Sequence, residues 1–121
     1  MLLKDFYSVE LSDEENGKYI THLKINKDHQ VYHGHFPNRP VTPGVILMHL
    51  FKEDAERRLG NSLQLKNANN IKFMAVVDPR IHNELILDYQ LEENNREIRL
   101  KGMAKTKDGI SLKINAIYKI N

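Results

Sequence analysis

One stretch of this sequence, between Thr42 and Gly60, has the residue spacing of an amphipathic helix. Thr42 is a residue type that caps helices, Pro43 suits a first helical turn, and Gly60 suits a helix end. Apolar residues recur between these positions with the helical period: Ile46, Leu47, Leu50, Phe51 and Leu59. We therefore expect one amphipathic helix, and the remaining elements must cover its apolar face.

The rest of the chain alternates apolar and polar residues with the period of two that is typical of strands. Before the helix, the alternation predicts strands over 7–11 and 18–25, separated by the turn signal Asn16-Gly17. After the helix, four more strands are expected: 71–77, 85–91, one that begins at Ile98, and 110–116. Two strands, one helix and four strands predict an α+β fold in which an antiparallel sheet carries one helix on a face.

The composition excludes several classes of protein. The 121 residues contain neither a repeat nor a linker, so we expect a single domain over 1–121. The absence of cysteine excludes disulfides and thiolate metal sites, and it fits the cytoplasmic location that we expect. Residues 1–5 do not resemble a signal peptide, and no apolar run approaches the roughly 20 residues that span a bilayer. A net charge of +2 gives no support for nucleic-acid binding.

The segment from His33 to Val45, directly before the predicted helix, is the most informative about function. It holds two of the six histidines, three of the four prolines and two of the six glycines. Proline fixes φ and glycine admits unusual conformations, so the segment is predicted to be a loop with one defined shape. Imidazole titrates near neutral pH, which makes His35 a candidate general base. The backbone N–H of Gly44, at the positive end of the helix, is a candidate donor to a substrate carbonyl oxygen.

These residues carry a resemblance to a known family. The sequence His35-Phe36-Pro37-Asn38-Arg39-Pro40-Val41-Thr42-Pro43-Gly44-Val45-Ile46-Leu47 resembles the active-site segment of the hot-dog-fold 3-hydroxyacyl-[acyl-carrier-protein] dehydratases of fatty acid synthesis. That segment reads His-Phe-Pro-Gly-x-Pro-x-x-Pro-Gly-Val-Leu, and this chain departs from it in the loop at Asn38. Asn70-Ile71-Lys72-Phe73, followed by Val77-Asp78-Pro79, is similar to the family's strand after the helix. The resemblance therefore covers nearly the whole chain.

The resemblance implies a hot-dog fold, in which an antiparallel sheet wraps around one central helix, and an enzyme of the lyase class. It implies a homodimer or higher homo-oligomer, with an acyl-carrier-protein or coenzyme A thioester entering a tunnel between subunits. It implies no metal, and we expect no cofactor; the charge and hydropathy above give no reason to expect nucleic acid or a membrane span. His35 would be the catalytic base, and the substrate would contact Phe36, Pro43, Gly44 and Val45.

The family's second catalytic group is a helix carboxylate five residues after the Pro-Gly glycine, and this chain has His49 there. Glu53 follows one turn later on the same face, where it could pair with His49 and hold it charged. A His49–Glu53 couple could therefore replace the carboxylate, or His35 could perform both proton transfers. Alternatively, this face of the helix is solvated and carries no chemistry, because His49 lies among charged residues such as Lys52.

Other functions are compatible with the same residues. A hot-dog thioesterase would hydrolyse the thioester, with Glu53 as its carboxylate. A catalytically degenerate subunit would bind acyl chains or pair with an active relative. A zinc site at His33, His35 and His49 lacks the usual ligand spacing.

Several basic residues could form a rim for an acidic carrier protein, or an ordinary mixed-charge surface. They are Arg39, Lys52, Arg57, Arg58, Lys72 and Arg80. The remaining histidines, His22, His29 and His82, are expected to be surface residues.

Overall fold

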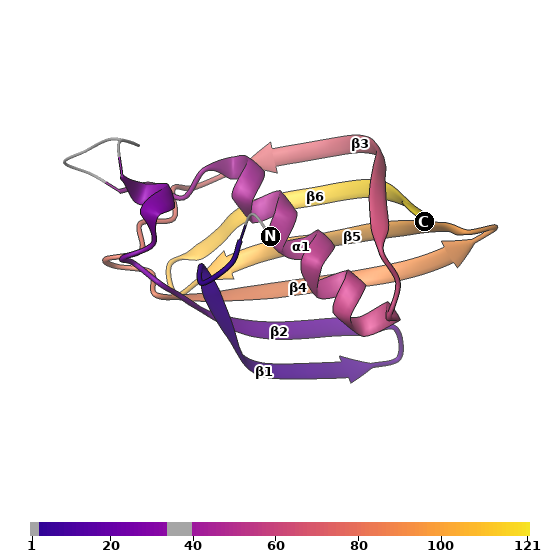
Figure 1. The fold of residues 1–121 in the computed structure, drawn as a ribbon, viewed down its shortest axis with the longest axis horizontal. Coiled ribbons are helices and arrows are strands. Elements are labelled where there is room, and N and C mark those ends of the chain that lie inside the picture. Colours follow the sequence, from indigo (N-terminus) through magenta and orange to yellow (C-terminus); the bar gives the residue numbers. More distant parts are fainter. Residues whose placement is uncertain (1–2, 34–39) are drawn as a thin grey trace.

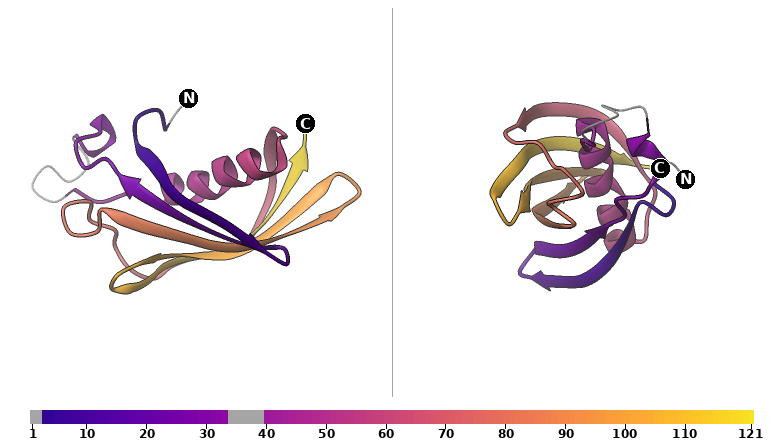
Figure 2. Two further views of the ribbon diagram at one scale, coloured as in Figure 1. Left: turned by 90° about the horizontal axis from the view of Figure 1, so that it is seen from below. Right: turned by 90° about the vertical axis from the view of Figure 1, so that its left-hand side faces the viewer.

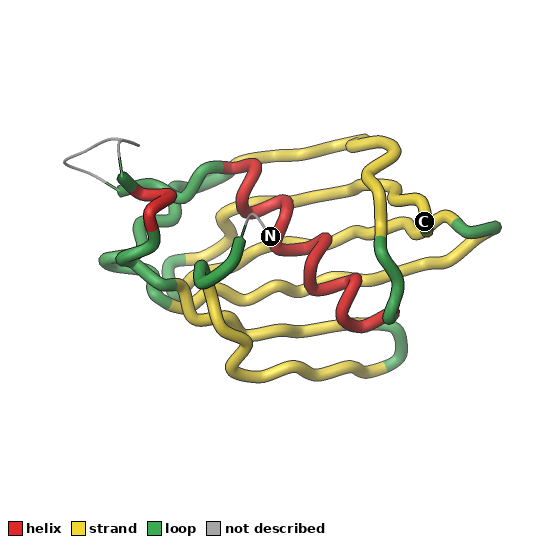
Figure 3. Tube along the Cα trace, in the orientation of Figure 1, coloured by secondary structure: helices red, strands yellow, loops and turns green. Residues whose placement is uncertain are grey.

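The computed structural model describes residues 3–33 and 40–121. Its elements are β1 (Tyr7–Glu15), β2 (Lys18–Ile25), a 3-10 turn η1 (Gln30–Tyr32), α1 (Gly44–Leu59), β3 (Leu63–Phe73), β4 (Glu84–Asn94), β5 (Glu97–Thr106) and β6 (Gly109–Ile120). Two strands thus precede one α-helix and four follow it, which confirms the predicted order of elements (Figure 3).

The described strands form one six-stranded sheet in the order β1-β2-β4-β5-β6-β3, and every neighbouring pair is antiparallel. α1 crosses one face of this sheet (Figure 1). The end-on view in Figure 2 shows the strands curling around the helix, with β1 and β3 at the two edges. This is the predicted α+β arrangement of a sheet wrapped around one central helix.

The core lies between the inner face of the sheet and α1. Leu23, Leu85 and Leu87 are fully buried on the sheet side, as the alternation in β2 and β4 predicts. Ile46, Leu47, Leu50, Phe51 and Ala55 are buried on the helix side. The predicted apolar stripe of the helix is therefore confirmed, although Leu59 at its end is only half-buried.

The two ends of α1 differ in how well the sequence predicted them. Gly60 has a φ of 70° in the left-handed region and closes the helix with a bond from its N–H to the Glu56 carbonyl, as predicted. The prediction that Thr42 caps the helix is wrong, because Pro43 occupies the N-cap position and no side chain caps it. Thr42 is buried, and its Oγ1 lies 2.8 Å from the Tyr32 hydroxyl while its N–H bonds the Val77 carbonyl.

The strand bounds were wrong at both edges of the sheet. β1 extends to Glu15 rather than Leu11, and β3 spans 63–73 rather than 71–77. Residues 64–70 of β3 are all exposed, so no buried face imposes an alternating pattern on their sequence. Backbone pairing with β6 holds this polar strand in place. In the described part of the chain, no helix is long and apolar enough to cross a membrane.

Candidate active site

His35 and Phe36, the first residues of the family-like segment, lie outside the described residues. The structure describes the segment from Pro40 into α1, and the candidate site is therefore built from the helix. Pro43 and Gly44 are half-buried at the helix start, and Val45 is 69% exposed.

Gly44 opens α1, where the first N–H groups of a helix have no partner within the helix. A side chain at this position would collide with the ring of Phe73 at the end of β3. Phe73 itself is 57% exposed. Met74 and Val76, which follow it in the chain, are 46% and 48% exposed. The helix N-terminus is thus bordered by exposed apolar side chains.

His49 and Glu53 lie together one turn further along α1. Their closest atoms, His49 Nε2 and Glu53 Oε2, are 3.4 Å apart, and the side chains are 31% and 6% exposed. The alternative of a solvated helix face does not fit Glu53, which is buried beside the half-buried imidazole, and the catalytic role of the pair stays a prediction. The i,i+4 spacing predicted their proximity.

Tyr7, at the start of β1, holds the other oxygen of Glu53. The Tyr7 hydroxyl donates to Glu53 Oε1 at 2.7 Å and accepts from Arg57 Nη1 at 2.5 Å. Burial raises the pKa of Tyr7 to about 12; the hydrogen bond from Arg57 opposes this shift and the bond to Glu53 adds to it. Glu53 Oε2 is buried and has no hydrogen-bond partner among residues 3–33 and 40–121, because its approach to His49 lacks hydrogen-bond alignment.

Asp54, the next residue, is 2% exposed and accepts several hydrogen bonds. Its donors are the Thr21 hydroxyl (2.7 Å), the Tyr89 hydroxyl (2.5 Å), Arg57 Nη2 (2.8 Å) and Arg58 Nε (3.4 Å). Burial alone would raise the pKa of Asp54, but the bonds from Tyr89, Thr21 and Arg57 lower it below its ordinary value. Asp54 therefore ties α1 to β2 and β4 as an anion.

Sequence reasoning missed Asp54, although a signal was present. Asp54 follows Leu47, Leu50 and Phe51 at helical spacing, so a carboxylate interrupts the apolar stripe. A charged residue in that position needs buried donors. Tyr7 and Tyr89 gave no such signal, because each alternates in a strand like an ordinary core residue.

Gly102 in β5 makes room for Tyr89. The two residues are paired across β4 and β5, and a side chain at 102 would overlap the Tyr89 Cβ. The backbone carbonyl of Asp88 would lie only 2.6 Å from it. The missing side chain thus permits the Tyr89 ring to stand where its hydroxyl reaches Asp54.

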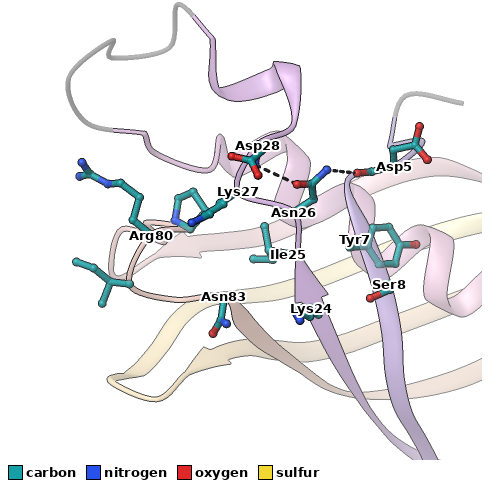
Figure 4. A pocket seen from close by; sticks show the side chains of 12 residues that line it. Asp5, Tyr7, Ser8, Lys24, Ile25, Asn26, Lys27, Asp28, Arg80 and Asn83 are labelled. Carbon is teal, nitrogen blue, oxygen red and sulfur yellow. Dashed lines mark hydrogen bonds between the residues drawn. The ribbon is translucent and has the colours of Figure 1, made fainter.

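A hollow of about 700 Å³ lies beside the start of β1 and the end of β2 (Figure 4). Its lining includes Asp5 and Tyr7 on one side, Lys24 and Lys27 from β2 and the turn after it, and Arg80. Among the described residues, Tyr7 alone belongs both to this lining and to the contacts of Glu53. Tyr7 therefore contacts both the hollow and the Glu53 carboxylate.

The predicted basic rim is largely committed to other contacts. Lys52 pairs with Glu56 at 3.2 Å, and Arg80 pairs with Asp78 at 2.9 Å. Arg57 and Arg58 both bind Asp54. Arg39 lies outside the described residues, and Lys72 lines a second hollow on the outer face of the sheet with Lys18, Lys101 and Lys113.

The other histidines have definite places. His29 caps η1 by accepting from the Val31 N–H, and His82 is bound to Asp108 at 2.6 Å with only 11% of its side chain exposed. The expectation that these histidines are surface residues is therefore wrong for His82, whereas His22 and His29 are half-buried and keep part of their surface exposed. Of the possible zinc ligands, His33 is exposed and His35 is not described; the described residues hold no cluster of three that could bind a metal.

An antiparallel sheet wrapped around one helix is the hot-dog fold, and comparison with solved structures confirms it. The dehydratase heterocomplex ApeI:P from Xenorhabdus doucetiae aligns with a TM-score of 0.76 at 17% identity, covering 93% of this chain and 97% of that one. A hypothetical thioesterase with coenzyme A from Streptococcus pneumoniae TIGR4 aligns with a TM-score of 0.68 at 12% identity, covering 98% and 90%.

The family model for ApeI-like dehydratases (ApeI dehydratase) matches residues 11–111, so this chain belongs to the ApeI-like dehydratase family. Among curated proteins, the 3-hydroxyacyl-[acyl-carrier-protein] dehydratase FabZ of Variovorax paradoxus is 35% identical over 68 residues, 54% of this chain. FabZ of Bartonella henselae is 34% identical over 90 residues, 64% of this chain. The matches span 45% and 57% of the lengths of these relatives.

Proposed function

We propose that this protein dehydrates 3-hydroxyacyl thioesters carried on acyl carrier protein or coenzyme A to trans-2-enoyl thioesters. Membership of the ApeI-like family and the resemblance of 35–47 to the dehydratase active-site segment support this reaction. FabZ relatives, named for the same activity, match over about half of their length.

The reaction needs a base, an acid and a stabiliser of negative charge. His35 takes the proton α to the thioester carbonyl, and the C–H electron pair becomes the new C=C bond. The β-hydroxyl leaves as water after it receives a proton. The Gly44 N–H stabilises the enolate-like charge on the thioester oxygen, with Phe36, Pro43 and Val45 lining the substrate site. Elimination of water involves no net redox change, so we propose no cofactor.

One observation carries the assignment of the second catalytic group. Glu53 is a buried carboxylate whose Oε2 lies 3.4 Å from His49 and has no hydrogen-bond partner within the described chain. A buried carboxylate oxygen without a partner is costly, and a catalytic role is one explanation for such a group. We assign the proton transfer to the departing hydroxyl to His49, with Glu53 stabilising its charged form.

We further propose that a second hot-dog subunit completes the site. Exposed apolar side chains surround the start of α1, and the edge strand β3 leaves one side of its backbone unpaired in the described chain. The ApeI:P structure is described as a heterocomplex, which favours a paired assembly, with either a second copy or a related chain as partner. Light scattering of the purified protein should give about twice 14.1 kDa if the partner is a second copy.

Thioester hydrolysis is the second candidate. In that reaction Glu53 would accept a proton from an attacking water, which requires the bound substrate to bring water to its buried Oε2. The two reactions differ in product, because hydrolysis releases a free thiol and dehydration does not.

The variant His35→Ala tests the proposed base. We expect it to abolish dehydration while the circular dichroism spectrum and thermal unfolding stay unchanged. His33→Ala is the matched control, because His33 lies two residues away in the same segment and is exposed. We expect this variant to dehydrate the substrate at the wild-type rate. Normal turnover by His35→Ala would refute the assignment.

A further inference from the structure

We infer that Tyr7 is a positioning residue for the His49–Glu53 pair: its hydroxyl, held by Arg57, fixes one oxygen of Glu53 so that the other faces His49. This inference deepens the proposed function and rests on it for its kinetic consequence. The contacts themselves are independent of the reaction.

The hydrogen bonds run in one direction. Arg57 can only donate, so the Tyr7 oxygen accepts from it and the single Tyr7 proton goes to Glu53 Oε1. Arg57 is itself fixed, because its Nη2 donates to the buried Asp54 at 2.8 Å. The Tyr7 hydroxyl therefore does not rotate freely, and neither does the carboxylate that it holds.

The tyrosine ring is also fixed by packing. Arg57 Cζ lies 5.3 Å from the centroid of the Tyr7 ring, and the Phe6 ring meets it edge-on with centroids 6.3 Å apart. Tyr7 is half-buried, whereas the other residues of β1 are exposed. A strand that is otherwise solvated thus sends one side chain inward, and that side chain ends on Glu53.

This arrangement determines which nitrogen of His49 faces the carboxylate. His49 Nε2 is the atom 3.4 Å from Glu53 Oε2. The two groups are not aligned for a hydrogen bond, but the negative charge of the carboxylate still favours a proton on the nearer nitrogen, so we expect the neutral ring to favour the Nε2–H tautomer. If Glu53 were free to rotate, both the tautomer and the ring orientation would lose this preference.

The variant Tyr7→Phe tests the inference, because it removes the hydroxyl and keeps the ring. Nitrogen-15 chemical shifts of the His49 imidazole, assigned with a His49→Ala sample, measure the fraction of each neutral tautomer. We expect the wild-type ring to be mainly the Nε2–H form and the variant to be a mixture. The same variant should lower kcat by about 10-fold with little change in KM, since substrate contacts are retained.

Tyr19→Phe is the matched control. Tyr19 also lies under an arginine, with Arg58 Cζ 4.6 Å from its ring centroid, but its hydroxyl makes no bond to Glu53. We expect this variant to keep both the wild-type tautomer and the wild-type kcat.

The tautomer measurement decides the inference. An unchanged fraction in Tyr7→Phe would overturn it, whatever the rate. A shifted fraction in Tyr7→Phe but not in Tyr19→Phe supports it. If the wild-type protein dehydrates no 3-hydroxyacyl thioester, the proposed function fails, and the tautomer comparison still tests the role of Tyr7.

Discussion

Two adjacent carboxylates on α1 differ in how many donors they hold. Asp54 accepts from two hydroxyls and two guanidinium groups, so its capacity is used within the fold. Glu53 accepts one bond from Tyr7 and keeps a buried oxygen next to His49. We therefore assign Asp54 to stability and Glu53 to the reaction.

Loss of the Glu53 charge should impair the reaction and spare the fold. Glu53→Gln keeps the side-chain volume but removes the negative charge that stabilises a charged His49, so we expect kcat for dehydration to fall at least about 10-fold. We expect His49→Ala to lower kcat by a similar factor. Lys52→Ala, on the same helix and paired with Glu56, should keep the wild-type rate. If all three variants kept the wild-type kcat, His49 and Glu53 would have no role in the reaction.

Asp54→Asn should instead lower the stability of the fold. The amide cannot accept all four bonds, and Arg57 and Arg58 lose their charged partner, so we expect unfolding to require about 2–3 kcal/mol less. Urea unfolding followed by circular dichroism measures this difference. A variant as stable as wild type would show that the Asp54 contacts do not hold the helix on the sheet.

Local spacing predicted some of these residues and not others. The i,i+4 rule placed His49 and Glu53 together, because both lie on one helix. The contacts from Tyr7 to Glu53 and from Tyr89 to Asp54 join residues 46 and 35 positions apart. Such pairs depend on how the sheet curls over the helix, which no local pattern in a single sequence encodes.

At the scale of elements, the sequence predicted the inner strands better than the edges. β2 and β4 bury one face and keep a strict alternation, so their positions follow from period two. β3 is an edge strand with a polar, exposed middle, and backbone pairing with β6 rather than side-chain burial defines it. The helix start was misplaced by one residue because Thr42 bonds Tyr32 instead of capping the helix.

The close approach of β4 and β5 at Gly102 leads to a prediction about the sheet. Gly102→Ala should force Tyr89 away from the position where it reaches Asp54, because the new methyl would overlap Tyr89 and the Asp88 carbonyl. We expect a loss of about 1–3 kcal/mol in unfolding free energy, as for other overpacked sites. Lys101→Ala, the exposed neighbour on the outer face, is the control and should change stability little. Full stability of the Gly102 variant would contradict the close packing of Gly102 against Tyr89.

At the scale of the whole molecule, the Asp54 contacts predict how stability depends on pH. The folded-state pKa of Asp54 lies below its ordinary value of 3.8, so the unfolded chain takes up this proton first as the pH falls. The stabilisation from the ionised Asp54 is complete at neutral pH. It is lost as the pH falls below 3.8 and then through the pKa of Asp54 in the folded protein. Asp54→Asn should therefore lose less stability than wild type between about pH 5 and pH 2. Equal acid sensitivity of the two proteins would contradict this coupling.

The start of α1, the end of β3 and the start of β1 lie towards the same end of the molecule (Figure 1). This end carries the Gly44 amide and the exposed apolar side chains that we propose a second subunit and the acyl chain cover. The sequence segment 35–47 identified this region, and the structure adds the buried carboxylate system behind it.

The most direct test of the proposed dehydration is a product analysis with a 3-hydroxyacyl carrier-protein substrate. Mass spectrometry of the carrier-bound acyl group and a thiol-specific dye would follow loss of water and release of thiol in the same reaction. We predict a carrier-bound product that is lighter than the substrate by the mass of one water, about 18 Da, and no release of free thiol. Thiol release without the unsaturated product would make the protein a thioesterase, and neither product would make it a non-catalytic subunit; either result would contradict dehydration as its activity.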